Sequence, residues 1–477
     1  MKDADERRFQ ALTAWAQSNG ANLHPSLEIY HDNVTKYSVR VKESVSDGLK
    51  PPFDAIACPL PTTISYANAL IDGPIALSAT EQPKSPAFPE RFMNTLPPHV
   101  IGRFFFIQQY LKADNSYWQP YIATLPQPEH TDSWALPAFW PEENVDFLAG
   151  TNAYVAIVEI QANVKREFKQ AINILREEDF PDWQDYNTQL LYNWAFCIFT
   201  SRSFRSSLVL SQPAQAQISQ LLPPGCEMDD FSILQPLFDI PNHSMTSNYD
   251  WDVSSDPNCC QLICKDAYGA GDQVYNNYGL KTNSELLLAY GFILPRTEAV
   301  HNDYVHVRKR GQGGSSTSPA SRPKDFLISL QPMSDPSSVV GKARQLSSNG
   351  PQLHTHPAFA HFEHALIYDL AFALSIDDEK RTIEQLMSNG QNKDDELPSS
   401  LDELLERIKQ TLSAKLLYDY QELKHVGLAE DMEDLEDDEL DQKQLLMVTY
   451  RRQCEKVLVA ALRTIGVLGS PSENQAR

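Results

Sequence analysis

The sequence has few of the residues that mark several common protein classes. Its 477 residues include seven cysteines, an odd number that does not suit a disulfide framework, so we expect reduced thiols. No uncharged apolar run approaches the length needed to cross a bilayer, and the first eight residues are mostly charged, unlike a signal peptide. These absences predict a soluble protein of the cytoplasm or nucleus, without a membrane partner.

Positive charge is also scarce. There are 40 Lys and Arg against 63 Asp and Glu, which gives a formal net charge of −23. Nonspecific binding to nucleic acid needs basic surfaces that displace phosphate counterions, so we expect no direct nucleic-acid partner. An acidic body would attract basic proteins by long-range steering, although the same charge also keeps a protein soluble. The charge therefore favours a basic protein partner and says nothing about oligomeric state.

Glycine-rich nucleotide-binding loops are missing as well. Gly269-Ala270-Gly271 is the nearest approach to a dinucleotide-binding turn, and the residues after it have the pattern of a strand, not of the required helix. The sequence contains no Walker A loop, no nucleophile elbow and no His-Glu-x-x-His. These observations argue against the common nucleotide-binding and hydrolytic classes.

Three cysteines are close enough to raise the question of zinc. Cys259, Cys260 and Cys264 fall within six residues, but adjacent cysteines are awkward tetrahedral ligands and no Cys-x-x-Cys pair accompanies them. We expect no zinc here.

Four histidines also raise the question of a metal. His354, His356, His361 and His364 fall within eleven residues, and the last two could share one helical face. Glu363 is the one acidic residue at a convincing spacing, and helix surfaces often carry histidine without function. We expect no metal in this protein.

Hydrophobic periodicity predicts an α+β fold. Two groups of short strands are separated by a helical insert and followed by a mostly α-helical segment. The expected strands are 37–41, 55–58, 234–237, 261–265 and 273–278. The expected helices are 6–18, 100–110, 152–176, 183–200, 284–292, 361–375, 401–415 and 442–465.

Changes of composition divide the chain into segments. We expect an amino-terminal helix and first strand group over 1–99, a helical insert over 100–215, and a second strand group over 216–310. Residues 311–324 are low-complexity and predict a flexible linker, because they cannot bury apolar surface. A helical domain over 325–477 completes the chain.

Two stretches in the second strand group carry the most information: Phe238–Ser244, which contains Asn242-His243, and Asn277–Phe292, which contains Tyr278-Gly279. They resemble the closing half of a SET-domain protein methyltransferase. The resemblance is to the branch that holds the Rubisco large-subunit lysine methyltransferase, ribosomal-protein lysine methyltransferases and the actin-histidine methyltransferase. Matches at Ser116–Tyr121, Leu148–Thr151, Ser201–Phe204 and Tyr450–Leu458 extend it over most of the chain.

The resemblance implies a SET β-fold with a pseudoknot at Asn242-His243, an inserted helical segment, and a carboxyl-terminal substrate-binding domain of the Rubisco-methyltransferase type. It implies a protein-lysine N-methyltransferase that uses S-adenosylmethionine as cosubstrate and a non-histone protein, ribosomal or translation-related, as substrate. The residues that it assigns are Asn242, His243 and Arg202 for the cosubstrate, Tyr278 for the methyl-transfer pore, and Tyr290, Phe204, Ser201 and Asp239 for the channel that admits the target side chain.

These residue types suit the chemistry. Transfer of a methyl group from a sulfonium to an amine needs a neutral nucleophile, close approach and exclusion of water. A narrow aromatic channel supplies dryness, and desolvation lowers the pKa of a lysine amine.

The amino-terminal part departs from the family pattern. The family opens its SET domain with a turn of the type Gly-Arg-Gly-Leu, whose backbone lies against the cosubstrate, and here the corresponding stretch is Lys36–Val41, without either glycine. Two hypotheses follow: an active lysine methyltransferase that docks its substrate through the helical domain, or a catalytically weak SET-like protein that binds a partner. Methylation of histidine is a variant of the first hypothesis, and the channel residues do not separate the two targets.

Overall fold

The structure is a computed structural model, and it describes residues 2–77, 85–308, 325–345, 353, 356–389, 397–425 and 439–469. The chain forms two compact units. The first unit is Met1–Phe139 with Ile160–Gly279, and the second is Trp140–Glu159 with Leu280–Arg477. The segment boundaries expected from composition stay a prediction.

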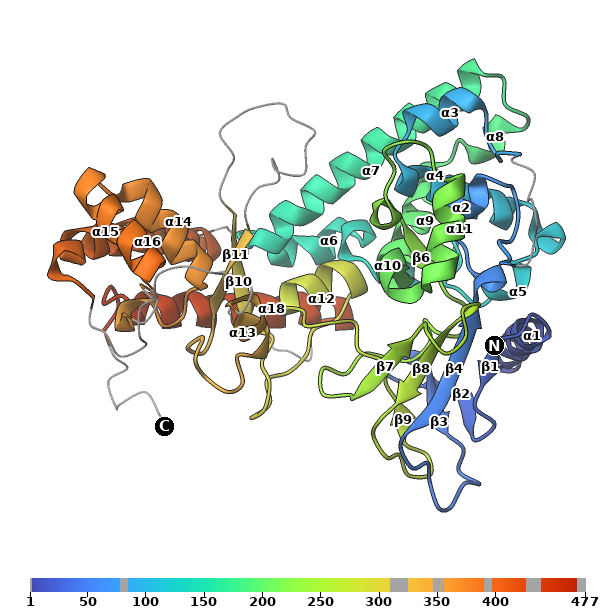
Figure 1. Cartoon of the computed structure of the whole chain (residues 1–477), viewed down its shortest axis with the longest axis horizontal. Coiled ribbons are helices and arrows are strands. Elements are labelled where there is room, and N and C mark those ends of the chain that lie inside the picture. The colour runs from blue at the N-terminus through green and yellow to red at the C-terminus, as the bar shows by residue number, and fades with distance from the viewer. Residues whose placement is uncertain are drawn as a thin grey trace. The chain divides into compact units, whose positions relative to one another are not determined.

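The first unit contains small antiparallel sheets (Figure 1). One has the strand order β1-β4-β8-β7, a second β2-β3-β9, and a third pairs β5 with β6. The strands are β1 (Asn22–Leu23), β2 (Leu27–Asp32), β3 (Lys36–Val41), β4 (Phe53–Pro59), β5 (Ser203–Arg205), β6 (Ser232–Leu234), β7 (Tyr249–Asp252), β8 (Cys259–Cys264) and β9 (Gln273–Val274). The strands expected at 37–41, 55–58 and 261–265 are confirmed.

Two expected strands are wrong in their extent. β6 ends at Leu234, because Pro236 has no N–H to donate and Leu237 has a left-handed backbone with φ of 68°. β9 covers only Gln273 and Val274, and after it the backbone leaves the sheet except for an isolated parallel bridge between Asn276 and His243. The first motif stretch is therefore mostly irregular backbone, and the second is irregular up to Thr282, after which the helix α12 (Asn283–Tyr290) begins.

Helices supply most of the rest of the first unit. They are α1 (Lys2–Ser18), α2 (Tyr66–Ala69), α3 (Glu90–Thr95), α4 (Pro98–Leu111), α5 (Gln119–Ile122), α8 (Trp183–Tyr186), α9 (Gln189–Arg202), α10 (Ser206–Val209), α11 (Gln212–Leu221) and the larger part of α7 (Asn152–Glu177). The single helix expected over 183–200 is wrong. It is two helices separated at Asn187 and Thr188, the second of which is extended, and both residue types favour a helix interior only weakly.

Helix α4 lies at the centre of the apolar core of the first unit. Phe104, Phe105 and Phe106 are fully buried. The Phe106 ring stacks on Trp194 of α9 with 4.7 Å between the ring centroids, and Phe105 meets Trp118 edge to face at 5.6 Å. Burial of large aromatic rings on this scale stabilises a fold strongly.

The second unit is mostly helical. Its helices are α6 (Glu142–Val145), α12 (Asn283–Tyr290), α13 (Val339–Gln345), α14 (His364–Leu374), α15 (Asp377–Asn389), α16 (Asp402–His425) and α18 (Gln442–Thr464), besides the start of α7. It also contains an unexpected hairpin of β10 (Tyr304–Arg308) and β11 (Asp325–Ser329). The expected linker 311–324, between these strands, lies outside the described residues. Among the described residues, no helix is long and apolar enough to cross a bilayer.

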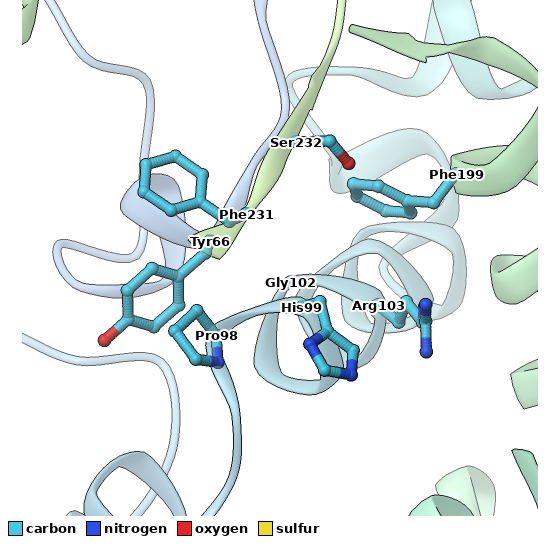
Figure 2. Close-up of a pocket in the computed structure, with 8 residues that line it drawn as sticks. All are labelled: Tyr66, Pro98, His99, Gly102, Arg103, Phe199, Phe231 and Ser232. Carbon is cyan, nitrogen blue, oxygen red and sulfur yellow. The ribbon is translucent and has the colours of Figure 1, made fainter. Parts of the chain in front are cut away.

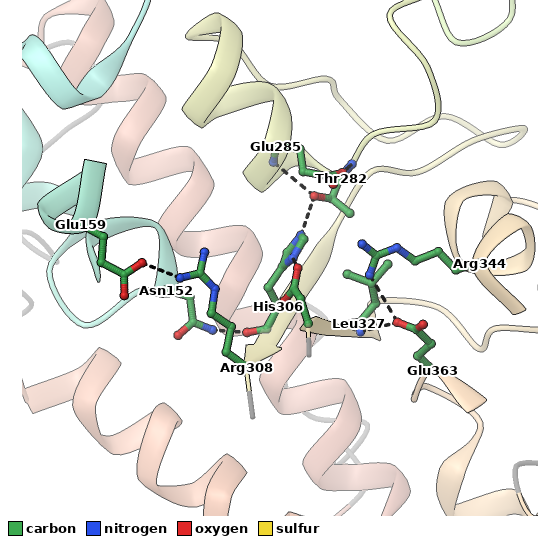
Figure 3. Close-up of polar contacts among 10 residues, drawn as sticks. Asn152, Glu159, Thr282, Glu285, His306, Arg308, Leu327, Arg344 and Glu363 are labelled. Carbon is green, nitrogen blue, oxygen red and sulfur yellow. Dashed lines mark hydrogen bonds and ion pairs between the residues drawn. The ribbon is translucent and has the colours of Figure 1, made fainter. Parts of the chain in front are cut away.

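Polar contacts hold the segment 140–159 to the hairpin within the second unit (Figure 3). Asn152 donates its side-chain amide to the carbonyl of His306, and Arg308 pairs with Glu159 at 2.7 Å. The His306 ring lies 2.8 Å from Thr282 Oγ1 and 2.7 Å from Asp325 Oδ2. The hairpin therefore links residues that are far apart in sequence.

Candidate active site

The Asn-His segment lies directly beside the tyrosine segment. The parallel bridge brings them together: the Asn276 N–H donates to the Asn242 carbonyl at 2.8 Å, and the Ser244 N–H donates to the Asn276 carbonyl at 2.9 Å. The two motifs, which are some 35 residues apart in sequence, therefore form one structural element.

Tyr278 is anchored on this segment at both its backbone and its hydroxyl. Its backbone N–H donates to His243 Nδ1 at 3.0 Å, and its hydroxyl donates to the Pro241 carbonyl at 3.0 Å. The rings of Tyr278 and His243 stack with 5.0 Å between centroids and 18° between planes. Because Nδ1 accepts a hydrogen bond, His243 is in the tautomer that carries its proton on Nε2. The position and orientation of Tyr278 are thus fixed.

A buried ion pair lies next to this element. Arg202, at the end of α9, places its guanidinium 3.1 Å from Asp239 Oδ2, and Tyr121 of α5 donates its hydroxyl to the same oxygen at 2.9 Å. The Asp239 side chain is 1% exposed, whereas that of Arg202 is 31% exposed. The other oxygen, Asp239 Oδ1, is buried without a hydrogen-bond partner among the described residues. Such an oxygen is costly to leave unpaired, so it is a candidate contact for an N–H donor.

Burial controls the ionisation of this cluster. Burial raises the pKa of Asp239 above that of an ordinary aspartate, although Arg202 and Tyr121 act in the opposite direction. Burial raises the pKa of the Tyr121 hydroxyl strongly, and the Asp239 charge adds to the effect. For Arg202, burial would lower the pKa, but the facing Asp239 outweighs it and raises the pKa. The guanidinium therefore stays charged.

Aromatic rings pack beside the buried pair. The Phe204 ring meets Phe238 at 5.3 Å and Trp251 at 5.4 Å, both edge to face. The Trp251 indole N–H donates to Asn276 Oδ1 at 3.1 Å, which ties the aromatic group to the motif element. Ser201 lies in α9 and donates its hydroxyl to the Cys197 carbonyl of the same helix at 2.8 Å.

The hairpin of β2 and β3, whose second strand is the stretch without the family's glycines, also contributes to this site. Asn242 donates its side-chain amide to Thr35 Oγ1 and to Gln273 Oε1, each at 2.8 Å. Lys36, the first residue of the glycine-free stretch, has φ of 68° and so takes the left-handed conformation that glycine favours.

Seven of the eight residues assigned by the resemblance lie in the first unit, and Tyr290 lies in the second. Within the first unit, contacts join Asn242, His243 and Tyr278, and Asp239 joins Arg202. Tyr290 ends α12 before Gly291, which has φ of 73°, and burial raises the pKa of its hydroxyl to about 12. Its role in the channel stays a prediction.

Three residues of the site were not assigned a role from the sequence: Tyr121, Trp251 and Gln273. Tyr121 lies in a stretch that matched the family, but only its bond to Asp239 indicates a role, and these residues are 118 positions apart. Trp251 and Gln273 lie on short strands among ordinary strand residues. No local pattern distinguishes them.

Neither metal candidate forms a cluster. Cys259, Cys260 and Cys264 lie on β8, where alternation of side chains puts Cys259 on the opposite face from the other two. His361 Nδ1 contacts the Ser329 carbonyl at 2.9 Å, and His354 lies outside the described residues. The part of the chain that the structure describes holds no group of three His, Cys, Asp or Glu residues that could bind a metal.

A separate small cavity lies between α2, α4, α9 and β6 (Figure 2). Its volume is about 20 Å³, which is room for a water molecule and not for a nucleoside. It is lined by Tyr66, Pro98, His99, Gly102, Arg103, Phe199, Phe231 and Ser232. None of these belongs to the motif element, so the cavity is not the candidate active site.

Comparison with known proteins agrees with the motifs. No protein-family model matches the chain. The ribosomal lysine N-methyltransferase set10 of Schizosaccharomyces pombe is 29% identical over 311 residues, which are 62% of this chain and 49% of the relative. The protein-lysine N-methyltransferase EFM1 of Saccharomyces cerevisiae is 24% identical over 58% of this chain and 48% of the relative. The human actin-histidine N-methyltransferase is 22% identical over 60% of this chain and 42% of the relative.

The chain thus spans about half the length of the curated relatives it matches. Among solved structures, it matches the SET domain of LSMT bound to lysine and AdoHcy with a TM-score of 0.59 and 16% identity, over 96% of this chain and 91% of that chain. It matches Rubisco LSMT bound to AdoMet with a TM-score of 0.57 and 17% identity, over 97% of each chain. The resemblance to the Rubisco-methyltransferase branch and the α+β SET fold are therefore confirmed.

Proposed function

We propose that this chain is a protein-lysine N-methyltransferase that uses S-adenosylmethionine. The observation that carries the proposal is the joined element of Asn242, His243 and Tyr278, within a fold shared with structures bound to AdoMet and AdoHcy. Three residues that the motifs assign to one site are held together by backbone hydrogen bonds and ring stacking. A loose or accidental match would not give this arrangement.

The residues present fit this cosubstrate. Asn242, His243 and Arg202 would hold it, and the adjoining Gly279 is open: its φ is 100°, and no described atom lies within 4 Å of the place where a Cβ would stand. A bound S-adenosylmethionine supplies an electrophilic methyl group on a sulfonium. Neither the fold nor the site offers a metal ligand set among the described residues, and the chemistry needs none.

The residues of the chain would exclude water from the target amine and orient it. Phe204, Phe238 and Trp251 form an aromatic surface that excludes water, and desolvation lowers the pKa of a lysine amine so that it loses its proton before transfer. Tyr278 orients the amine at the pore. Asp239 is held in place beside this surface by its ion pair with Arg202 and the hydrogen bond from Tyr121. Ser201 lines the proposed channel, and the role of Tyr290, which lies in the second unit, stays a prediction.

The alternative, a catalytically weak partner-binding protein, is motivated by the missing glycines. The hydrogen bonds of Asn242 to Thr35 and Gln273 argue against it, because they hold the residue assigned to the cosubstrate in place without the glycines.

The substrate is proposed to be a non-histone protein, ribosomal or translation-related, as the name of the set10 relative suggests. The acidic chain favours a basic substrate, which the second unit would dock, and a cytoplasmic or nuclear location is part of this proposal. Methylation of histidine is the second candidate, because the relatives include actin-histidine methyltransferases.

The test has two stages. Calorimetric titration of the purified chain with S-adenosylmethionine and S-adenosylhomocysteine should give micromolar binding of both, and absence of binding by a folded sample would favour the partner-binding alternative. Incubation with tritium-methyl-labelled cosubstrate and purified ribosomes should then label a protein band. Mass spectrometry of the labelled peptide separates methyl-lysine from methyl-histidine.

A further inference from the structure

Gln273 is the centre of a hydrogen-bond network around Asn242. Its Oε1 accepts from Asn242 Nδ2 at 2.8 Å and from Ser38 Oγ at 3.1 Å, and its Nε2 donates to the Tyr30 hydroxyl at 2.6 Å. Ser38 is fully buried in β3, and Gln273 faces Arg40 of the same strand in the sheet register. Gln273 is therefore held firmly by two strands, and it holds Asn242 in turn.

The donor and acceptor of each hydrogen bond in this network can be assigned, starting from Asp32. Asp32 Oδ1 accepts from the backbone N–H groups of Val34 and Thr35, at 2.8 and 2.7 Å, and from Thr35 Oγ1 at 3.0 Å. These bonds, led by that from the Thr35 backbone, hold the pKa of Asp32 below its ordinary value, so the group is a carboxylate and can only accept.

The hydroxyl proton of Thr35 is consequently committed to Asp32. Thr35 Oγ1 must then accept from Asn242, so the atom of Asn242 that faces it is the nitrogen, Nδ2. The same nitrogen faces Gln273 Oε1, and both hydrogen bonds of the side chain run from that nitrogen. The carboxamide oxygen of Asn242 is thereby turned away from the hairpin.

We propose that Gln273 and Asp32 are positioning residues that lock the carboxamide of Asn242 with its oxygen presented as an acceptor for the α-ammonium group of the cosubstrate. This inference rests on the proposed function. A cosubstrate of this class has two kinds of N–H donor, the α-ammonium and the adenine amine. The ammonium is the stronger partner, because a hydrogen bond with a charged donor is about twice as strong as a neutral one.

The hydrogen bonds that hold the Asn242 carboxamide suggest how the site could bind its cosubstrate without the family's glycines. A glycine turn would bring backbone close to the cosubstrate, whereas here Thr35, Ser38 and Gln273 supply side-chain groups that orient an existing contact residue.

The test uses the full chain and two commercial ligands. S-adenosylhomocysteine carries both the ammonium and the adenine amine, whereas methylthioadenosine carries the adenine amine alone. Gln273→Met keeps the length of the side chain but removes its acceptor, and Gln273→Glu restores an acceptor toward Asn242. Asp32→Asn, in an exposed turn, replaces a group that can only accept by one that can also donate, so the Thr35 hydroxyl proton is no longer committed to position 32. Asp335→Asn is the matched control, because Asp335 caps a similar turn through Ser337 in the second unit.

By calorimetry we expect Gln273→Met to weaken S-adenosylhomocysteine binding by about tenfold while methylthioadenosine changes by less than about twofold. Gln273→Glu should stay within about threefold of the parent for both ligands, and Asp32→Asn should weaken S-adenosylhomocysteine binding by about threefold while Asp335→Asn has no effect. Thermal unfolding followed by circular dichroism reports whether each variant is folded. If Gln273→Met does not fold, the surface variant Asp32→Asn decides the test.

Unchanged binding of S-adenosylhomocysteine by Gln273→Met would overturn the inference and leave the proposed function intact. Equal weakening of both ligands would also overturn it, because a merely structural role does not distinguish them. If the parent chain binds neither ligand, the proposed function fails and this inference fails with it.

Discussion

Tyr121 donates its hydroxyl proton to Asp239 at 2.9 Å, and both side chains are almost entirely buried. With Arg202, which pairs with Asp239, they form a trio of tyrosine, carboxylate and arginine. The first unit contains a second such trio, in which Tyr192 donates to Glu167 at 2.9 Å and Arg103 pairs with that glutamate at 2.8 Å. The first trio adjoins the motif element and the second does not. The comparison separates a role in the site from a role in the core.

Tyr121→Phe should make cosubstrate binding more sensitive to acid. Burial raises the pKa of Asp239 and the Tyr121 hydrogen bond opposes that rise, so its loss raises the pKa further. Asp239 is then protonated at higher pH and Arg202 loses its ionised partner. In calorimetric titrations at a series of pH values, the affinity of this variant for S-adenosylhomocysteine should be about tenfold below that of the parent at the lowest pH. The pH at which the affinity begins to fall should be higher than in the parent. Tyr192→Phe is the control, and an identical shift in that variant would refute the assignment.

Tyr278→Phe should reduce turnover by about a hundredfold and change the Kd for S-adenosylmethionine by less than about threefold. The ring stack on His243 and the backbone bond to His243 Nδ1 both survive this change, so the fold of the site is kept. Methyl transfer and calorimetry on the same preparation measure the two quantities, and Tyr275→Phe on the same segment is the control. Comparable loss of binding and turnover would contradict the assigned role.

Asn242→Ala should have the opposite profile. It removes the carboxamide that is held by Thr35, in the turn between β2 and β3, and by Gln273 of β9, so the Kd for S-adenosylmethionine should rise by about tenfold or more. Turnover at saturating cosubstrate should fall much less than in Tyr278→Phe. Normal cosubstrate affinity in Asn242→Ala would remove Asn242 from the site.

Lys36→Gly should stabilise the protein. A left-handed backbone costs a residue with a Cβ about 1–2 kcal/mol, and the greater flexibility of glycine in the unfolded chain offsets part of this, so the gain should be about 0.5–1 kcal/mol. The midpoint of urea unfolding should rise. Lys42→Gly, where the backbone is not left-handed, should lower it, and a fall in both variants would show that Lys36 is not strained.

The second unit should lose stability in mild acid through His301. This side chain is fully buried beside Ser338, and burial, with a contribution from Arg296, lowers its pKa from 6.5 to about 4. The unfolded chain takes up a proton near pH 6.5 and the folded one does not. The contribution of His301 to the free energy of unfolding is therefore fully present above pH 6.5, and that free energy falls by about 3 kcal/mol as the pH drops to 4.

Urea titrations at several pH values measure this slope. His301→Gln should flatten it, because the replacement carries no titrating group, whereas replacement of the exposed His130 by Gln should leave it unchanged. A slope that is the same in the parent and in His301→Gln would exclude His301 as its source.

The sequence was informative where a signal is local. Apolar spacing predicts α4, α7 and α18 almost to the residue, and the motifs predict that Asn242, His243 and Tyr278 act together. The helix expected over 183–200 was wrong because two weak helix formers, Asn187 and Thr188, interrupt an otherwise regular pattern.

The remaining features depend on contacts between distant parts of the chain. Gln273 is a site residue because it meets Asn242 and Ser38, the latter 235 positions away. Asp239 is buried with Tyr121 only because α5 packs against its loop. The hairpin of β10 and β11 was missed because its strands are five residues each and flank a low-complexity segment. None of these pairings leaves a periodic trace in the sequence.

The division of the chain has a consequence for its synthesis. Residues 140–159 belong to the second unit, where Arg451 donates to the carbonyls of Ala149 and Leu423, and Arg308 pairs with Glu159. On the ribosome these residues emerge roughly 300 positions before Arg451, so they must wait unpacked until nearly the whole chain is made. Neither unit is a contiguous piece that can be cut out intact, and the chain should be expressed as a whole.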